Sequence, residues 1–269
     1  MTVINTNVNS IIAQNALKVN GRSMGNAMAQ LSTGNRINSA KDDAAGLAIS
    51  DSLTAQIRSL NVAVRNANDG ISLAQTAEGA MIEISSMMQR MRELAVQAGT
   101  GTLSPSQREF LDLEFKQLQT QISKTITDTK WNGFNVLSTA NLVFNIQVGT
   151  ENGTQTVAIT SSGLDGAYTS ADVSTVGSAG TAMGSLDTGL ANLNKARATL
   201  GATVSRLTSA ADNITNISQN LSQSRSRIRD ADYAQVTTEL ARTMIIQQAG
   251  IAVLAQANQL PTSVLALLR

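Results

Sequence analysis

Apolar residues recur at alternating steps of four and three through a long stretch from 49 to 98. This row contains Ile49, Leu53, Ile57, Leu60, Val64, Ala67, Ile71, Ala74, Glu78, Met81, Ile84, Met88, Met91, Ala95 and Ala98. The spacing predicts a coiled-coil helix of about 50 residues, and the second of two successive steps of three, at Ile84, predicts one stammer. We expect Asp42 or Asp43 to cap its start and Gly99 to end it.

A second long stretch repeats this pattern in the return half of the chain. It contains Leu186, Leu190, Leu193, Arg197, Leu200, Val204, Leu207, Ala211, Ile214, Ile217, Leu221, Ser224 and Ile228, with a stammer at Ile217. Between the two stretches, Ser104-Pro105 predicts the start of another helix, with Gln107 at the capping-box position. Its apolar stripe is Leu111, Phe115, Leu118, Ile122 and Thr125.

Residues 132–185 have a different composition, rich in Gly, Ser and Thr. Phe144, Ile146 and Val148 alternate with polar residues, and Val157 and Ile159 alternate after the turn dipeptide Asn152-Gly153. This pattern predicts a β-hairpin within a polar tip. The predicted fold is therefore mainly α: an elongated antiparallel coiled-coil rod of long helices, with a small β-hairpin region and with the termini paired at one end.

The two ends of the chain carry no charged side chains, in residues 1–17 and 243–268. Chain ends are normally solvated, and a helix that is apolar on several sides must be covered on several sides. Met244, Ile245 and Ile246 are consecutive and point around most of a helix. We therefore predict burial by other copies of the chain through Val8, Ile11, Ile12, Met24, Met28, Leu31, Leu240, Met244, Ile251, Leu254, Val264, Leu265 and Leu268.

Composition narrows the classes of function. The chain has 20 basic and 19 acidic residues, so it lacks the basic excess typical of nucleic-acid binding. It has no Cys and no His, which removes the usual nucleophilic, general-base and transition-metal chemistry and favours a protein that is not an enzyme and has no cofactor. For the Asp42-Asp43 pair, helix capping is favoured over a metal site.

Neither end has the pattern of a cleaved signal peptide. The C-terminal run is long enough to cross a bilayer, but its amides and Pro261 argue against a membrane span. If the protein is secreted, it needs another export route.

Six motifs in order make the chain resemble bacterial flagellin over nearly its whole length. They are INTNVNS (4–10), LSTGNRINSAKDDAAGLAIS (31–50), NANDGISLAQTAEGA (66–80), QRMRELAVQA (89–98), SRIRDADYA (226–234) and LAQANQLPTSVLALLR (254–269). The resemblance implies that 1–40 and 230–269 form the inner core of an extracellular filament. It also implies that 41–229 form a surrounding helical layer, without large outer domains.

The resemblance also implies partners. These are other flagellin subunits, an export chaperone on the C-terminal segment, and the filament cap and hook–filament junction proteins. The alternative is that the chain is itself a hook–filament junction protein, but the complete C-terminal motif favours the filament subunit.

Two side-chain clusters each allow two roles. Arg90, Leu94 and Glu114 match the patch that a vertebrate flagellin-sensing Toll-like receptor reads in this family, and contact between neighbouring subunits is the alternative role. Glu78 and Arg197 occupy core positions in their rows and either pair with each other or lean out to solvent.

Overall fold

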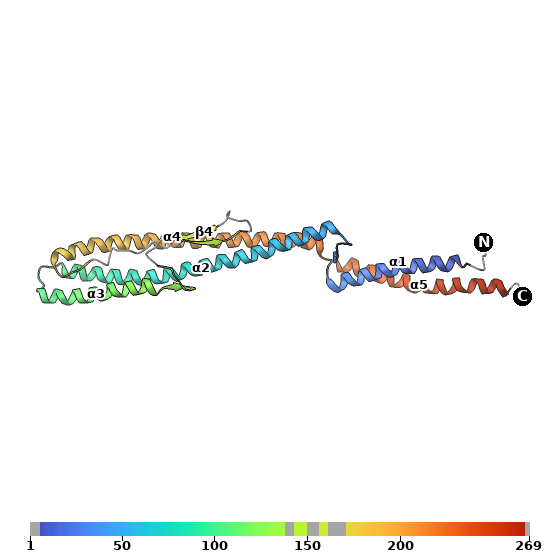
Figure 1. Cartoon of the computed structure of the whole chain (residues 1–269), viewed down its shortest axis with the longest axis horizontal. Helices are drawn as coiled ribbons and strands as arrows, with labels where there is room; N and C mark the ends of the chain where they lie inside the picture. The colour runs from blue at the N-terminus through green and yellow to red at the C-terminus, as the bar shows by residue number, and fades with distance from the viewer. Residues whose placement is uncertain (1–5, 138–142, 150–155, 161–170, 267–269) are drawn as a thin grey trace. The chain divides into compact units, whose positions relative to one another are not determined.

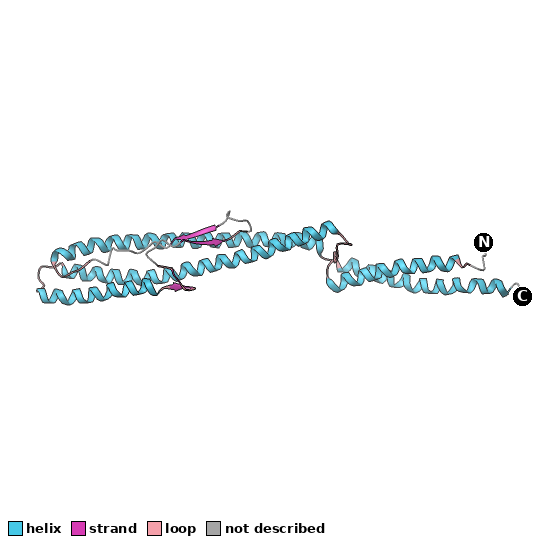
Figure 2. Cartoon of the chain, viewed as in Figure 1, coloured by secondary structure: helices cyan, strands magenta, loops and turns pink. Residues whose placement is uncertain are grey.

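The computed structural model describes residues 6–137, 143–149, 156–160 and 171–266. These residues are mainly helical, as predicted, with two small antiparallel sheets (Figure 1, Figure 2). The helices are α1 (Val8–Thr33), α2 (Ala44–Ala98), α3 (Pro105–Asp128), α4 (Val176–Arg229) and α5 (Tyr233–Ala266). Contacts divide the chain into two units, Met1–Ala55 with Asn220–Arg269, and Gln56–Gln219, and both α2 and α4 contribute to each.

Helix α2 begins and ends at the predicted caps. Asp43 is the N-cap, since its Oδ1 accepts a hydrogen bond from the Gly46 amide at 2.8 Å. Asp42 instead serves the preceding loop, where its Oδ2 accepts hydrogen bonds from Asn38 and Ser39. The Ser39 hydroxyl is the main cause that lowers the pKa of Asp42. At the other end, the Gly99 amide donates to the Ala95 carbonyl at 3.0 Å.

The start of α3 forms the predicted capping box. Ser104 Oγ accepts from the Gln107 amide, and the Gln107 side chain accepts from the Ser104 amide. One turn further, the buried Arg108 guanidinium donates to the carbonyls of Ala98 at 2.8 Å and Thr100 at 3.1 Å. A cation thus donates to carbonyls at and just beyond the C-terminal end of α2, which fixes the turn between the two helices.

Helices α2, α3 and α4 lie side by side in the unit Gln56–Gln219 (Figure 1) and bury a core of aliphatic and Met side chains. Phe115 is the one aromatic side chain among the largest fully buried ones within the described residues. Aromatic residues make up only 3% of the chain, so aliphatic and Met side chains fill most of this core. The fully buried large side chains are Phe115, Met81, Ile84, Met88, Met91, Leu94, Ile122, Leu137, Leu186, Leu193 and Leu207.

The predicted helical rows are wrong at two positions. Ile217 is 41% exposed, and Ser218 is buried in its place. The reason is that the buried residues Thr203, Leu207 and Ala211 of α4 follow one another at two successive steps of four. Two steps of four turn the buried face around the helix in the opposite direction to the two steps of three that the predicted stammer contains. On α2, Ile49 is likewise exposed while Ser50 is buried.

Two antiparallel hairpins follow α3. Strands β3 (Val143–Gln147) and β4 (Thr156–Thr160) form the predicted hairpin, and the Asn152-Gly153 turn lies outside the described residues. The structure adds a short hairpin of β1 (Lys130–Trp131) and β2 (Phe134–Asn135). Its turn residues Asn132 and Gly133 both have positive φ, as a two-residue type I′ turn requires.

Hairpin β3–β4 is placed against α2 by close contacts. Asn66 Nδ2 donates to the Gln147 carbonyl at 3.1 Å. A Cβ added to Gly70 would lie 3.1 Å from Ile146 and 3.2 Å from Leu207, so glycine lets the hairpin and α4 approach α2 closely.

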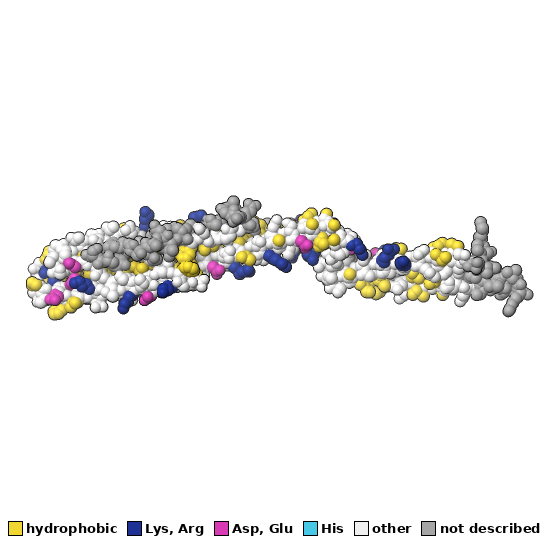
Figure 3. All heavy atoms as spheres, viewed as in Figure 1, with side chains coloured by type: hydrophobic (Ala, Val, Ile, Leu, Met, Phe, Trp, Pro, Cys, Tyr) yellow, Lys and Arg dark blue, Asp and Glu magenta, His cyan; other side chains and the backbone are white. Residues whose placement is uncertain are grey.

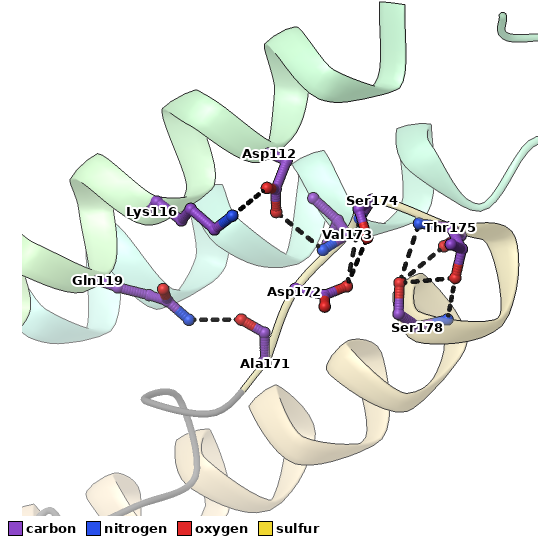
Figure 4. A network of polar contacts seen from close by, with 9 residues as sticks. All are labelled: Asp112, Lys116, Gln119, Ala171, Asp172, Val173, Ser174, Thr175 and Ser178. Carbon is purple, nitrogen blue, oxygen red and sulfur yellow. Dashed lines mark hydrogen bonds and ion pairs between the residues drawn. The ribbon is translucent and has the colours of Figure 1, made fainter. Parts of the chain in front are cut away.

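Helix α4 begins at Val176, ten residues earlier than the predicted row at Leu186, so the predicted tip of 132–185 extends too far. Thr175 Oγ1 accepts from the Ser178 amide, and Ser178 Oγ accepts from the Thr175 amide, which makes a reciprocal cap (Figure 4). Glycines in this turn disfavour a helix, but Ala179 and Ala182 are fully buried. Tertiary packing therefore overrides the local propensity.

A polar network attaches the segment before α4 to α3 (Figure 4). The buried Asp112 carboxylate accepts a hydrogen bond from the Val173 amide at 3.1 Å and pairs with Lys116 at 2.6 Å. Gln119 Nε2 donates to the Ala171 carbonyl at 2.7 Å. The hydrogen bond between Lys116 and Asp112 raises the pKa of Lys116. The network holds the residues just before α4 against α3.

We expect Asp112→Ala to lower the free energy of unfolding by about 1–3 kcal/mol, because it leaves the buried Val173 amide without an acceptor. Asp112→Asn should cost less, since its Oδ1 can still accept. Asp172→Ala, which removes an exposed carboxylate from the same network, should change stability by no more than about 0.5 kcal/mol. Urea unfolding measures all three, and equal losses for Asp112→Ala and Asp172→Ala would contradict this role.

Candidate assembly surface

The terminal helices α1 and α5 pack side by side in antiparallel order (Figure 1). Asn20 Nδ2 donates to the Thr243 carbonyl and Asn7 Nδ2 donates to the Ala257 carbonyl, both at 2.7 Å. The start of α1 therefore lies beside the C-terminal part of α5, as predicted for paired termini.

Loop contacts hold the other end of this helix pair. Asn35 and Asp230 form an antiparallel bridge, and the Arg36 amide donates to the Arg229 carbonyl at 2.6 Å. Gly34, in the left-handed conformation with φ 70°, ends α1 and accepts from the Ala231 amide. These contacts hold the end of α1 next to the start of α5.

The seam between α1 and α5 is built mainly from small or polar residues. Its buried members are Ser10, Asn20, Ala27, Val236, Thr243 and Ala257. Four of the predicted assembly residues lie partly in this seam, half-buried: Met24, Leu31, Leu240 and Leu254. Small side chains allow close approach of the helices but leave little room for large aliphatic groups between them.

Most of the large aliphatic side chains lie on the outer faces of the pair instead. Figure 3 shows yellow side chains recurring along the terminal helices. Among the predicted assembly residues, the exposed ones are Val8, Ile11, Ile12, Met28, Met244 and Ile251. The structure adds Val19, Ile245, Ile246 and Val253 to this exposed set. We call these ten residues the outer apolar face.

The sequence pattern did not separate these two roles. It predicted one set of assembly residues on the terminal helices, whereas the structure divides these residues between an inner seam and the outer apolar face. The backbones of Val264 and Leu265 lie in α5, and Leu268 lies outside the described residues.

Charges on this helix pair are few. Glu239 and Arg242 form an ion pair one turn apart on α5. The Arg242 guanidinium lowers the pKa of Glu239, and Glu239 raises the pKa of Arg242, through their mutual hydrogen bonds. These charges lie before the uncharged run of 243–268, and α1 carries Lys18 and Arg22.

A second cluster lies where α2 meets α3. Arg90 donates to Glu114 and to Glu93, both at 3.0 Å, and these hydrogen bonds, that to Glu93 first, raise the pKa of Arg90. Arg90 and Glu114 are exposed, but Leu94 is only 1% exposed. The structure therefore brings the three predicted residues together, with Leu94 in the core beneath the ion pair.

Glu78 and Arg197 approach each other between α2 and α4, with Arg197 Nη2 3.8 Å from Glu78 Oε1. Pairing, rather than separate solvation, is the arrangement observed. A shorter ion pair joins the same two helices nearer the C-terminal end of α2, where Arg92 donates to Asp187 at 2.6 Å. Arg92 lowers the pKa of Asp187, and Asp187 raises the pKa of Arg92, through this hydrogen bond.

The described residues contain no group of His, Cys, Asp and Glu side chains that could hold a metal ion. In the same residues, no helix has an apolar stretch long enough to cross a membrane. Asp42 and Asp43 have the loop and capping roles given above.

Family comparisons agree with the helical regions described above. The model for the bacterial flagellin N-terminal helical region matches residues 4–142, and that for the C-terminal helical region matches residues 183–268. The chain belongs to the bacterial flagellin family. The resemblance found in its motifs is therefore confirmed.

Individual relatives differ in how much of their length the chain covers. A flagellin of Halalkalibacterium halodurans is 41% identical over 99% of this chain and 100% of its own length, so it shares the short interval between the helical regions. Flagellin A of Vibrio anguillarum is 49% identical over 57% of this chain, which spans only 41% of that relative. The crystal structure of Bacillus cereus flagellin matches with a TM-score of 0.52 and 29% identity, over 56% of this chain and 88% of that one.

Reversing one charge of the Glu78–Arg197 pair should destabilise this flagellin by about 0.5–1 kcal/mol, because both side chains are partly exposed and solvent weakens their attraction. Glu78→Arg and Arg197→Glu each place like charges together, and the double reversal should recover most of the loss. Urea unfolding of all three variants tests the pair. Wild-type stability in both single variants would contradict it.

Proposed function

We propose that this flagellin is a structural subunit that is exported and polymerises into the extracellular flagellar filament used for swimming. The observation that carries the proposal is the outer apolar face of α1 and α5. Large aliphatic side chains at this density on both terminal helices remain in water unless another chain covers them. Family membership supports the same role.

Burial of this face supplies the driving force. At about 25 cal/mol per Å² of apolar surface, covering the exposed half of a large aliphatic side chain contributes roughly 1 kcal/mol. Ten such residues, repeated in every subunit, offset the entropy lost on assembly. In this proposal, 1–40 and 230–269 lie in the inner layer of the filament, and 41–229 lie around it.

The proposal includes the partners implied by the family. A chaperone covers the C-terminal segment before export, a cap protein acts at the growing end, and junction proteins connect the filament to the hook. The uncharged run of 243–268 is the segment that most needs such cover in the unassembled chain.

Removing residues 243–269 should abolish polymerisation and leave α2, α3 and α4 folded, because their core lies outside the terminal helix pair. Electron microscopy after induced polymerisation and circular dichroism measure the two outcomes. Normal filaments from this truncation would refute the assembly role.

Single substitutions separate the surface from the fold in the same assay. Ile245→Ser removes a side chain that is 65% exposed on α5, and Phe110→Ser removes one that is 68% exposed on α3. Only the first should impair polymerisation. A full-length chain that stays in short or non-helical assemblies would instead favour the alternative of a hook–filament junction protein.

A second proposed role is recognition by a vertebrate flagellin-sensing Toll-like receptor. It rests on the exposed ion pair between Arg90, which lies in the motif at 89–98, and Glu114 on α3. The charges are held in fixed positions by each other and by Glu93, which favours contact with a partner surface.

Arg90→Ala should lower activation of receptor-bearing cells by soluble monomer about tenfold, as loss of a charged residue at the centre of an interface does. Arg92→Ala is the matched comparison, because Arg92 is about equally exposed and paired, but with Asp187 on α4. Equal responses from both variants, or none from the wild-type monomer, would contradict this role.

A further inference from the structure

The seam between α1 and α5 has a repeat that leaves its register undecided. Its α5 side presents Val236, Thr243, Gly250 and Ala257 at intervals of seven residues. Sliding one helix past the other by one heptad, about 10 Å, would again place this row against α1. The two Asn hydrogen bonds cannot alone prevent such a slide, because every residue of α5 has a carbonyl that can accept.

One contact does distinguish the registers. Leu17 packs directly against Gly250, where an added Cβ would lie 2.6 Å from Leu17 Cδ2 and 3.2 Å from its Cγ. Gly250 is the single glycine between Tyr233 and Ala266. After a slide of one heptad, Leu17 would face Thr243 or Ala257, each of which has a Cβ in that position.

The three contacts describe one register. As the α1 residue changes from Asn7 to Leu17 to Asn20, its α5 partner changes from Ala257 to Gly250 to Thr243. The leucine contact therefore lies between the two hydrogen bonds. Both amides are satisfied where the leucine fits.

We propose that Leu17 and Gly250 form a knob and a hole that select the register of α1 against α5, and that Asn7 and Asn20 hold the selected register. The inference rests on the proposed function, because its consequence is for assembly. A one-heptad slide would displace Ile11 and Ile12 relative to Ile245 and Ile246 by about 10 Å and so change the surface offered to the next subunit.

Disulfide formation between pairs of engineered cysteines reports the register, because the chain has no native cysteine. Met24 and Leu240 are the next seam positions beyond the Asn20–Thr243 contact, so the pair Met24→Cys with Leu240→Cys should form a disulfide. Met24→Cys with Gln247→Cys reports a slide of one heptad and should not. Oxidation is carried out on the full chain, both unpolymerised and in filaments.

Gly250→Ala should reduce the Met24–Leu240 cross-link and raise the concentration needed for polymerisation about tenfold, as overpacking a close contact does. Alanine favours a helix more than glycine does, so this loss cannot come from helix propensity. Adding Leu17→Ala to the same chain makes room for the new methyl group and should recover polymerisation. Gly25→Ala on α1 is the control, because a Cβ there meets nothing within 4 Å.

The inference is overturned if Gly250→Ala behaves like Gly25→Ala, or if Leu17→Ala fails to improve the Gly250→Ala chain. Failure of the wild-type chain to polymerise would instead contradict the proposed function. The cross-linking of the unpolymerised wild-type chain and Gly250→Ala chain still decides the register in that case.

Discussion

The close approach of α1 and α5 is the constraint on which the terminal unit depends. Ser10, Ala27 and Thr243 are buried in a seam that leaves little room for large aliphatic side chains, so most of these side chains lie outside it. A soluble domain would place these groups in its own core. Here Asn7 and Asn20 form hydrogen bonds within the helix pair, whereas the outer apolar face is exposed and, in the proposed function, is covered by other chains.

In the unit Gln56–Gln219, long helices must pack in one defined arrangement with few aromatic side chains. Its core consists of Met, Leu, Ile and Ala layers, which give little positional specificity by themselves. Buried charged groups add that specificity. Arg108 closes the end of α2, and four residues later Asp112 attaches the segment that leads into α4. Arg108 and Asp112, one turn apart on α3, thus hold the end of α2 and the segment before α4.

Local signals in the sequence predicted the parts of the fold that depend on local physics. Asp43, Ser104 and Gln107 mark helix starts because capping needs only a side chain and a backbone amide a few residues away. The short hairpin at Asn132-Gly133 was missed, although this dipeptide is itself a turn signal. The buried roles of Arg108 and Asp112 were not predictable, because their partners lie on other elements. The start of α4 was hidden by glycines that tertiary packing overrides.

The proposed assembly residues were predicted as one set and not as two faces, and the reason is physical. A stripe in one helix shows which residues are apolar, whereas the partner helix decides which of them it covers. Gly250 contributes no hydrophobicity, so no apolar pattern points to it, yet it determines where Leu17 can lie. In a seam that repeats every seven residues, the residue that breaks the repeat carries the information about register. A missing side chain can therefore specify a surface as strongly as the aliphatic groups that form it.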